Sequence, residues 1–487
     1  MKNANVHFGT DGWRGILGRE FTSENLHRVA RALALTFQNK VPPKMQVVVG
    51  YDHRFLADKY AHETAVILSG FGFNPLLVPS PVTSPLLSFI TWKMKAPFGV
   101  MITASHNPPE YLGFKVKGSF GGSISTTTVK EIETHIDQTS EMESGFTWPK
   151  LEVKKAPNFM PAYMSYLKGH LDPGLFKKSK QKVVFDALYG PSVFAVQEFF
   201  RTVSPNSKLE LLHAQRDPTF GNSQPEPIEE YLTELKAAVK KQKANVGFAL
   251  DGDGDRLGVI DDKGRYLTPQ QVFALLFWYF LEHRGKRGKV VQAVSLGYLS
   301  QRIAKAYGCE FEEVSVGFKY VAEKLLTERV LIGGEESGGY AFGNEPGSKN
   351  VMLPERDGLF SGLLFMEMSL RTGKPVSRLI DELEDRFGTS CYLRKDIALK
   401  APIRDKAEFV KEIQGRFPTE WLGRKVKEMR SSDGLKIVLE DDSWFLIRPS
   451  GTEPVLRTYA EFPKVELSKK SLANLSKILY DVLIKAQ

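Results

Sequence analysis

Short apolar segments followed by longer segments of helical periodicity recur through most of this 487-residue chain. Three examples pair a strand with a following helix, near 46–50 and 59–68, 182–186 and 192–200, and 290–294 and 299–307. Alternation of this kind predicts βα units that build parallel or mixed sheets. The pattern therefore limits the fold to the α/β class for most of the chain.

The length is too great for one ordinary core and predicts about three or four domains. The pattern breaks near residues 150, 262 and 375; the first break is the polar stretch 138–150 and the second is Asp261-Asp262-Lys263-Gly264. We expect three α/β domains with mixed sheets at 1–150, 151–262 and 263–375. A linker and a smaller α+β domain are expected at 376–487.

The last of these regions has a different pattern. Apolar segments at 435–439 and 444–447 flank the polar turn 440–443, which predicts an antiparallel hairpin, and a final helix is expected at 466–485. No repeat of fixed period is evident along the chain.

The chain carries a formal net charge of +9 with 25% charged residues. A positive excess suits nucleic acid, an anionic membrane or small anionic substrates. The basic residues are scattered, their densest clusters lie near expected element ends, and no nucleic-acid recognition module is visible. We therefore interpret these clusters as solvated surface and do not expect nucleic acid as a partner.

Cysteine usage and hydropathy bear on location. Cys309 and Cys391 lie far apart and form no metal-spaced pair, which is typical of reduced packing residues. The longest apolar run, 272–281, is about half as long as a bilayer requires. It follows Thr268-Pro269-Gln270-Gln271, the pattern of a helix cap, first-turn proline and capping-box glutamine. We expect a buried helix there, no membrane partner, no apolar signal core at residues 1–5 and a cytoplasmic protein.

The sharpest local motif places Asp251, Asp253 and Asp255 at alternating positions with glycines between them. Such a loop can turn three carboxylates toward one hard cation. An EF-hand is disfavoured because Arg256 stands where that loop requires glycine and because the flanks resemble strands; a solvated acidic turn is the plainer alternative. Three carboxylates leave ligand positions open, so the expected metal is Mg²⁺ shared with a phosphate.

A second motif, Thr103-Ala104-Ser105-His106-Asn107-Pro108-Pro109, follows an apolar strand at 98–102. A serine at a strand end, in a loop stiffened by two prolines, is well placed to be a nucleophile or phosphate carrier. A serine hydrolase using His106 is disfavoured, since adjacent residues seldom orient as nucleophile and base and no G-x-S-x-G elbow occurs. Taken alone, the loop fits a structural turn equally well.

Two further glycine-containing loops offer polar groups. Gly333-Gly334-Glu335-Glu336-Ser337-Gly338-Gly339-Tyr340 presents carboxylate and hydroxyl groups that suit vicinal sugar hydroxyls, although by itself a plain capped turn is favoured. Arg448-Pro449-Ser450-Gly451-Thr452-Glu453-Pro454, with Arg457 beyond it, has the composition of a phosphate cradle, with a surface turn as the alternative.

Taken together and in this order, the four motifs resemble the α-D-phosphohexomutase superfamily of phosphoglucomutases, phosphomannomutases and phosphoglucosamine mutases. The opening Phe8-Gly9-Thr10-Asp11-Gly12-Trp13-Arg14-Gly15 is similar to that superfamily's N-terminal signature, so the resemblance runs from residue 8 to 457. It implies a heart-shaped enzyme of four domains, each giving one loop to a central site. The implied reaction interconverts hexose 1-phosphate and hexose 6-phosphate through a phosphoserine and a hexose 1,6-bisphosphate.

The resemblance also implies roles for individual residues. Ser105 matches the phosphoserine, which completes the Mg²⁺ site of Asp251, Asp253 and Asp255. The other implied roles belong to Lys115 as general acid/base, His106 beside the phosphoserine, Arg14 and Arg256 on the transferring phosphate, Lys319 of loop 315–319 on the ligand, Glu335 and Ser337 on the sugar O3 and O4, and Arg448, Ser450, Gly451, Thr452 and Arg457 on the other phosphate.

Details of the motifs bear on the substrate. Leu112 stands where the family usually has asparagine, and Gly338-Gly339 with Glu336 resembles glucose-type members more than those with a histidine in this loop. Glucose phosphate is favoured, with mannose and glucosamine phosphates open and either a monomer or a homodimer expected. A non-catalytic sugar-phosphate-binding paralogue is opposed by the presence of Ser105 and the aspartates. A metal-dependent phosphatase is opposed by Asp11-Gly12-Trp13, a poor match to its nucleophile.

Overall fold

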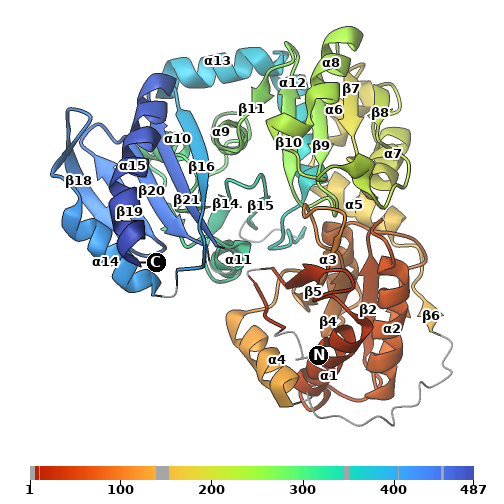
Figure 1. Cartoon of the computed structure of the whole chain (residues 1–487). Coiled ribbons are helices and arrows are strands. Elements are labelled where there is room, and N and C mark those ends of the chain that lie inside the picture. The colour runs from red at the N-terminus through yellow and green to blue at the C-terminus, as the bar shows by residue number, and fades with distance from the viewer. Residues whose placement is uncertain are drawn as a thin grey trace.

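A computed structural model describes residues 6–9, 11–138, 153–344, 350–403, 405–450 and 454–486. The chain forms four successive parts that follow an arc, so that the first part and the last lie at its two ends (Figure 1). The polar stretch expected at the first boundary lies almost entirely outside the described residues, as do Gly451 and Thr452. The fold class is confirmed: three parts combine helices with mixed sheets, and the last has an antiparallel sheet.

The first part contains a sheet in the order β1-β5-β4-β2-β3-β6. Its strands are β1 (Trp13–Ile16), β2 (Gln46–Tyr51), β3 (Asn74–Leu77), β4 (Phe98–Ile102), β5 (Tyr111–Gly118) and β6 (Lys154–Lys155), and its helices are α1 (Ser23–Gln38), α2 (Ala57–Gly70), α3 (Ser84–Lys93) and α4 (Thr126–Gln138). Strands β4, β2, β3 and β6 run parallel, and β5 and β1 are antiparallel additions.

The second part has a sheet in the order β11-β10-β9-β7-β8. Its strands are β7 (Lys182–Asp186), β8 (Lys208–Leu212), β9 (Val246–Leu250), β10 (Leu257–Asp261) and β11 (Tyr266–Leu267), and its helices are α5 (Met160–His170), α6 (Pro173–Lys178), α7 (Ser192–Thr202) and α8 (Thr233–Gln242), with 3-10 turns η2 (Phe220–Asn222) and η3 (Glu229–Tyr231). Because β11 pairs with β10, this sheet continues past residue 262 to Leu267.

The third part has a sheet in the order β13-β12-β14-β15. Its strands are β12 (Lys289–Ala293), β13 (Phe311–Val314), β14 (Val330–Gly334) and β15 (Tyr340–Phe342), and its helices are α9 (Pro269–Glu282), α10 (Leu299–Tyr307), α11 (Phe318–Thr327), α12 (Gly358–Thr372) and α13 (Val376–Phe387). The apolar run expected as a buried helix lies in α9, and Thr268 and Gln271 form the expected capping box.

These three sheets share an order of four strands: β5-β4-β2-β3, β10-β9-β7-β8 and β15-β14-β12-β13. In each, the last of three parallel strands leads through a short loop into an antiparallel partner: β4 to β5, β9 to β10, and β14 to β15. The three connecting loops contain Ser105, the three aspartates and Glu335, respectively. The structure therefore shows a repeat of topology where the sequence shows no repeat of fixed period.

The fourth part is an antiparallel sheet in the order β16-β21-β20-β19-β18-β17. Its strands are β16 (Cys391–Ala398), β17 (Glu420–Trp421), β18 (Arg424–Arg430), β19 (Leu435–Leu439), β20 (Trp444–Pro449) and β21 (Val455–Phe462), and its helices are α14 (Lys406–Arg416) and α15 (Val465–Ala486). The expected hairpin is β19–β20, and the expected final helix is α15.

Side chains of β20 alternate between two apolar clusters. Phe445 and Ile447 pack in the fourth part's own core, whereas Trp444 and Leu446 pack against Val294 and Tyr298 of the third part. This period of two places successive strand residues on opposite faces. The sheet thus has one face toward its helices and one toward the third part.

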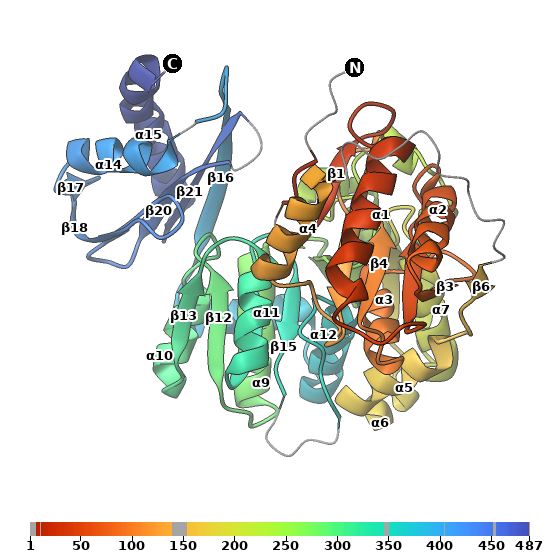
Figure 2. The same cartoon turned by 90° about the horizontal axis from the view of Figure 1, so that it is seen from below.

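The first three parts share an apolar core, whereas the fourth has its own. One cluster of buried side chains runs without a break from Val48 through Phe248 to Leu364, and α12 packs on the second sheet. The fourth part stands apart from the first in both views (Figure 2). Within the described chain, every helix is too short or too polar to cross a bilayer.

Candidate active site

Ser105 lies in the loop between β4 and β5 and is 1% exposed. Its φ of 54° is in the left-handed region, which non-glycine residues seldom adopt and which marks strain at functional sites. Its backbone N–H donates to Thr103 Oγ1 over 2.9 Å, and Thr103 in turn donates to Asp52 Oδ2 over 2.5 Å. These two hydrogen bonds therefore stabilise the loop conformation.

Arg54 supplies most of that support. Its guanidinium, fully buried, donates to four carbonyl oxygens of the serine loop, those of Ser105, Asn107, Pro108 and Tyr111, over 2.6 to 3.0 Å. Burial raises the pKa of the neighbouring Asp52 to about 6, although Arg54 opposes that rise. Both residues follow β2, which runs parallel to β4, so the ends of two adjacent strands meet at the site.

The aspartate loop between β9 and β10 meets the serine loop directly. Ser105 Oγ donates to Asp251 Oδ2 over 2.8 Å, and Asp251 Oδ1 accepts the backbone N–H groups of Asp255 and Arg256. Gly252 permits the approach, because a side chain there would overlap the Ser105 carbonyl oxygen. The serine hydroxyl and the first aspartate, predicted from separate motifs, are thus brought together.

The three aspartates form a set suited to a cation. Asp251, Asp253 and Asp255 are fully buried, and their ligand atoms lie within 4.8 Å of one another. The Oδ1 atoms of Asp253 and Asp255 are buried without a hydrogen-bond partner. Since buried carboxylate oxygens are rarely left unpaired, these atoms fit a hard divalent cation.

Protein cations occupy the opposite oxygens. Lys115 Nζ lies 2.8 Å from Asp253 Oδ2, 3.2 Å from Asp255 Oδ2 and 2.7 Å from Asp11 Oδ2. Arg356 Nη2 lies 2.7 Å from Asp255 Oδ2 and 2.5 Å from Asp11 Oδ2. Asp253 and Asp255 therefore each give one oxygen to the protein and keep the other for a ligand.

The pKa values of the clustered groups are shifted in different directions. Burial, reinforced by Asp253 and Asp255, raises the pKa of Asp251 well above its ordinary range. Burial would lower the pKa of Lys115, but Asp11, Asp253 and Asp255 together raise it. Burial, followed by the charge of Arg256, lowers the pKa of His106 well below its ordinary value, so this imidazole is neutral.

Two predicted arginines flank the serine loop. Arg14, in β1 opposite Gly113, donates to Asn107 Oδ1 over 2.6 Å. Arg256 donates to Glu226 Oε1 over 3.3 Å and lies 4.0 Å from Asp251 Oδ2. Each side chain lowers the pKa of His106, which places both near the loop that contains Ser105.

The predicted sugar loop follows β14 and meets the aspartate loop from the other side. Glu335 accepts the Gly317 N–H over 2.9 Å and lies 3.6 Å from Arg356, while Ser337 Oγ is buried without a hydrogen-bond partner. Burial raises the pKa of Glu335 to about 7, with Arg356 opposing the rise. A side chain at Gly338 would lie 2.8 Å from the Leu257 carbonyl oxygen. Packing against the second part therefore requires this glycine.

The predicted phosphate cradle lies in the fourth part. Arg448 of β20 pairs with Arg457 of β21, so both guanidinium groups start from the face that also carries Trp444 and Tyr459. Arg448 Nε lies 3.0 Å from Asp433, and Arg457 Nε lies 3.9 Å from Asp396. Ser450 is buried beside them, and Gly451 and Thr452 lie outside the described residues.

Lys319, in the first turn of α11, has its pKa lowered by burial and raised in part by Glu133 of α4. It therefore lies between the third and first parts.

The structure brings together Ser105, His106, Lys115, Arg14, Arg256 and the three aspartates. Glu335 joins them through Arg356, whereas Arg448, Ser450 and Arg457 form a separate group.

Sequence reasoning missed Arg356, Arg54 and Asp52. Arg54 and Asp52 could have been found because they follow a predicted parallel strand next to the serine strand. Arg356 is in no recognisable motif; it contacts Asp11, Asp255 and Glu335, which come from three different parts of the chain. Only the assembled fold identifies it.

Four family models match consecutive parts of this chain. They describe phosphoglucomutase/phosphomannomutase alpha/beta/alpha domain I at residues 5–143, domain II at 161–264, domain III at 268–387 and the C-terminal domain at 399–474.

Full-length relatives have names of the same kind. The chain is 30% identical over 481 residues to the phosphoglucomutase/phosphomannomutase of Thermococcus kodakarensis, covering 98% of this chain and 99% of that one. It is also 30% identical to the phosphoglucosamine/phosphogalactosamine mutase of Sulfurisphaera tokodaii, covering 97% and 98%.

Solved structures have the same architecture. A Thermus thermophilus protein assigned as a phosphomannomutase superposes with a TM-score of 0.85 at 32% identity, covering 98% of this chain and all of that one. Aspergillus fumigatus N-acetylphosphoglucosamine mutase, solved with GlcNAc-6P and magnesium, superposes with a TM-score of 0.59 at 13% identity over 99% and 96% of the two chains, a likeness of fold alone.

Proposed function

Because the chain belongs to the phosphoglucomutase/phosphomannomutase family of isomerases, we propose that it moves a phosphoryl group between C1 and C6 of an aldohexose phosphate through phospho-Ser105. The observation that carries this proposal is the contact between Ser105 Oγ and Asp251, beside two buried carboxylate oxygens without partners. A serine buried in a strained loop next to a cation site suits reversible storage of phosphate.

The proposed first step transfers phosphate from Ser105 to the free hydroxyl of a hexose monophosphate. The P–O bond to Ser105 Oγ breaks, a P–O bond to the sugar oxygen forms, and the hydroxyl proton ends on Ser105 Oγ. Lys115 is the proposed general acid/base for that proton. The resulting hexose 1,6-bisphosphate turns over in the site and returns its other phosphate to Ser105.

Several side chains would serve this step without taking part in bonds. Arg14 and Arg256 approach the serine loop and would balance the charge of the three equatorial phosphoryl oxygens. Neutral His106 adds no charge of its own beside them. Arg448, Ser450, Gly451, Thr452 and Arg457 would hold the phosphate that does not react and so align the sugar.

Asp251, Asp253, Asp255 and the Ser105 oxygen would hold the cation, for which Mg²⁺ is the proposed identity because carboxylate and phosphate oxygens are its preferred ligands. When bound, such an ion supplies charge neutralisation on the phosphoryl group. The magnesium named for the Aspergillus fumigatus structure is consistent with this choice.

For the sugar, we favour glucose phosphate, with mannose and glucosamine phosphates as alternatives. Glu335 and Ser337 would read the O3 and O4 hydroxyls; Glu335 is buried beside Arg356, and the Ser337 Oγ atom is buried without a hydrogen-bond partner. Glu336 accepts from Ser295 Oγ over 2.5 Å and so is tied to the third part. Gly338 is needed for packing on Leu257, which makes it weaker support for a glucose preference than the motif alone suggests.

The test combines intact mass with turnover. Protein purified from cells should contain a fraction heavier by one phosphate, which Ser105→Ala abolishes together with mutase activity. The matched control is Ser165→Ala on α5, whose hydroxyl donates to the Pro161 carbonyl on an exposed surface; mass and turnover should not change. Full activity in Ser105→Ala would refute the mechanism.

Two further arms complete the design. EDTA should abolish turnover and added Mg²⁺ should restore it. Parallel assays with glucose, mannose and glucosamine 1-phosphates, each primed with its own bisphosphate, should give the highest kcat/KM for glucose 1-phosphate.

A further inference from the structure

The turn between β18 and β19 contacts two functional loops from different parts of the chain. Asp433 Oδ2 accepts the backbone N–H of Val316 over 2.8 Å and lies 3.0 Å from Arg448 Nε. Val316 belongs to the segment before α11 that leads to Lys319, and Arg448 belongs to the phosphate cradle. One carboxylate oxygen thus meets both.

The backbone of this turn is fixed against Arg448. Gly434 has a φ of +86°, a conformation that glycine adopts without strain. A side chain there would overlap the Ile447 carbonyl oxygen and lie 3.0 Å from Arg448 Cα. Asp433 therefore cannot shift relative to Arg448 without moving the strand.

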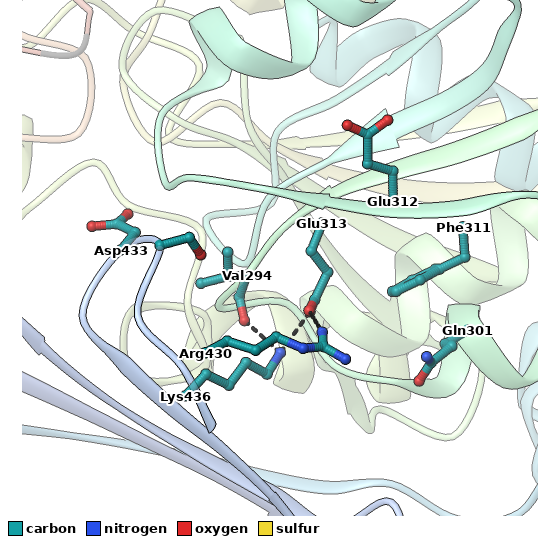
Figure 3. A pocket seen from close by; sticks show the side chains of 9 residues that line it. Val294, Gln301, Phe311, Glu312, Glu313, Arg430, Asp433 and Lys436 are labelled. Atoms are coloured by element: carbon teal, nitrogen blue, oxygen red, sulfur yellow. Dashed lines mark hydrogen bonds and ion pairs between the residues drawn. The ribbon is translucent and has the colours of Figure 1, made fainter. Parts of the chain in front are cut away.

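Neighbouring cations have other partners. Arg430 Nη1 and Lys436 Nζ each lie 2.6 Å from Glu313 of β13, and Lys436 also donates to the Val294 carbonyl oxygen. All of these residues line a cavity of about 370 Å³ between the third and fourth parts, with Asp433 on the side opposite Phe311 (Figure 3). Because Arg430 and Lys436 pair with Glu313, the charge of Asp433 faces that of Arg448.

A second carboxylate provides a comparison. Arg448 and Arg457 lie opposite each other on paired strands, where like charges are destabilising unless other groups compensate. Asp433 faces the first arginine and Asp396 faces the second at 3.9 Å. Asp396 lies on β16 and pairs with Arg394, so it shares the charge role of Asp433, whereas the Val316 N–H donates to Asp433.

We propose that Asp433 is a positioning residue that couples the phosphate cradle of the fourth part to the loop of the third part that carries Lys319. The proposal rests on the function proposed above. Asp433 Oδ2, 3.0 Å from Arg448 Nε, holds the guanidinium by charge beside the loop of the third part. When a phosphate binds Arg448 and the guanidinium moves toward it, Asp433 moves with Arg448 and shifts Val316, whose N–H it accepts. Phosphate binding by the fourth part and sugar binding by the third part therefore strengthen each other.

The first test compares Asp433→Ala, Asp433→Asn and the control Asp442→Asn in the full-length enzyme; Asp442 lies in the β19–β20 turn, where it forms an exposed pair with Lys427. Asparagine at 433 can still accept the Val316 N–H but carries no charge, so it should have the milder effect. For glucose 1-phosphate, KM should rise about fivefold in Asp433→Ala and about twofold in Asp433→Asn, with kcat within about twofold of the parent. Asp442→Asn should match the parent in both constants.

The second test is a double-mutant cycle. Adding Asp433→Ala to Arg448→Ala should change KM by less than about twofold, because a coupled pair loses its interaction once. The ratio of kcat/KM for glucose over mannose 1-phosphate should change in Asp433→Ala but not in Asp442→Asn. Additive effects, or an unchanged KM and sugar ratio in Asp433→Ala, would overturn the proposal.

A binding measurement separates this proposal from the proposed function. Calorimetric titration with glucose 1,6-bisphosphate needs no turnover, and Asp433→Ala should bind it several-fold more weakly than the parent and Asp442→Asn. A parent enzyme without turnover would contradict the proposed function alone. Equal affinities in Asp433→Ala and the parent would contradict the coupling alone.

Discussion

Arg356 joins three parts of the chain at the centre of the site. It pairs with Asp11 of the first part and Asp255 of the second, and lies 3.6 Å from Glu335 of the third. It also stacks on Phe318, 5.0 Å from the ring centre, and a side chain at Gly339 would overlap it. Its charge is therefore shared among carboxylates from three parts of the chain.

Arg356→Met should destabilise the enzyme in EDTA by about 3 kcal/mol, because it leaves buried Glu335 without the arginine it faces and leaves Asp255 with Lys115 alone. Urea denaturation monitored by circular dichroism measures the effect. The matched control is Arg201→Met, which removes a surface pair with Glu198 on α7 and should leave the curve nearly unchanged. Equal curves for both variants would contradict the bridging role.

Glu335 gives a pH dependence. Burial raises its pKa from 4.5 to about 7, so the carboxylate that would accept sugar hydroxyls becomes protonated near neutrality. We expect kcat/KM to fall below pH 7, and the limb to disappear in Glu335→Gln. A limb of the same pKa in Glu335→Gln would exclude this assignment.

The same shift has a defined sign for stability. Because the folded pKa exceeds the unfolded one, the contribution of Glu335 is fully present below pH 4.5 and is lost as pH rises through 7. Glu335→Gln should therefore gain stability relative to the parent as pH rises across this window, which thermal melts at pH 5 and pH 8 can detect.

The residues that the sequence identified share one property: each lies in a compact motif. Ser105 and the three aspartates come from two short loops, and the chemistry expected of each loop can be inferred from its own residues. The roles of Arg356 and Asp433 can be inferred only from their contacts with residues distant in sequence. The sequence therefore predicts residues that belong to one motif. It does not predict residues whose role depends on contacts between segments far apart in the chain.

At the scale of elements, the close approach of two loops depends on Gly252. A methyl group there would collide with the Ser105 carbonyl oxygen and push the aspartate loop away from the serine hydroxyl. Arg54 holds the serine loop by four hydrogen bonds, so the aspartate loop is the one that would move.

Gly252→Ala should lower kcat at least about tenfold, since small displacements of reacting groups are costly. Steady-state kinetics measure the change. Gly415→Ala is the control: this glycine lies in α14 with open space around it, and alanine there should leave kcat unchanged and add up to about 1 kcal/mol of stability. Normal kcat in Gly252→Ala would show that the loops tolerate separation.

Helices and strands were predicted where the pattern was local. The strands expected at 98–102 and 182–186 coincide with β4 and β7, and the expected cap at Thr268 begins α9. The sequence did not reveal that α12 packs on the second sheet, because its apolar residues are compatible with either neighbour. Strand identity is set by local periodicity, whereas helix placement depends on the neighbouring surface.

At the scale of the molecule, the fourth part is the element best placed to move. The first three parts share a continuous core, whereas the fourth meets the third through a small apolar cluster and polar contacts that include those of Glu313, Asp433 and Glu461. Residues 388–390 are the short link before β16, and Gly388 has a φ of +84°. We therefore expect domain closure on ligand binding.

Small-angle scattering tests that expectation. Saturating glucose 1,6-bisphosphate should reduce the radius of gyration of the full-length enzyme, and Arg448→Ala should prevent the reduction at the same ligand concentration. Superimposable profiles with and without ligand would argue that the fourth part is fixed.

The common strand order of the first three sheets separates scaffold from chemistry. In each sheet a loop joins the last parallel strand to an antiparallel neighbour, yet one loop carries Ser105, one the three aspartates and one Glu335. Under the proposed function, phosphate storage, cation binding and sugar recognition would therefore lie on separate loops of a common scaffold. A substitution in the Glu335 loop would then alter sugar preference while Ser105 and the aspartates keep their places.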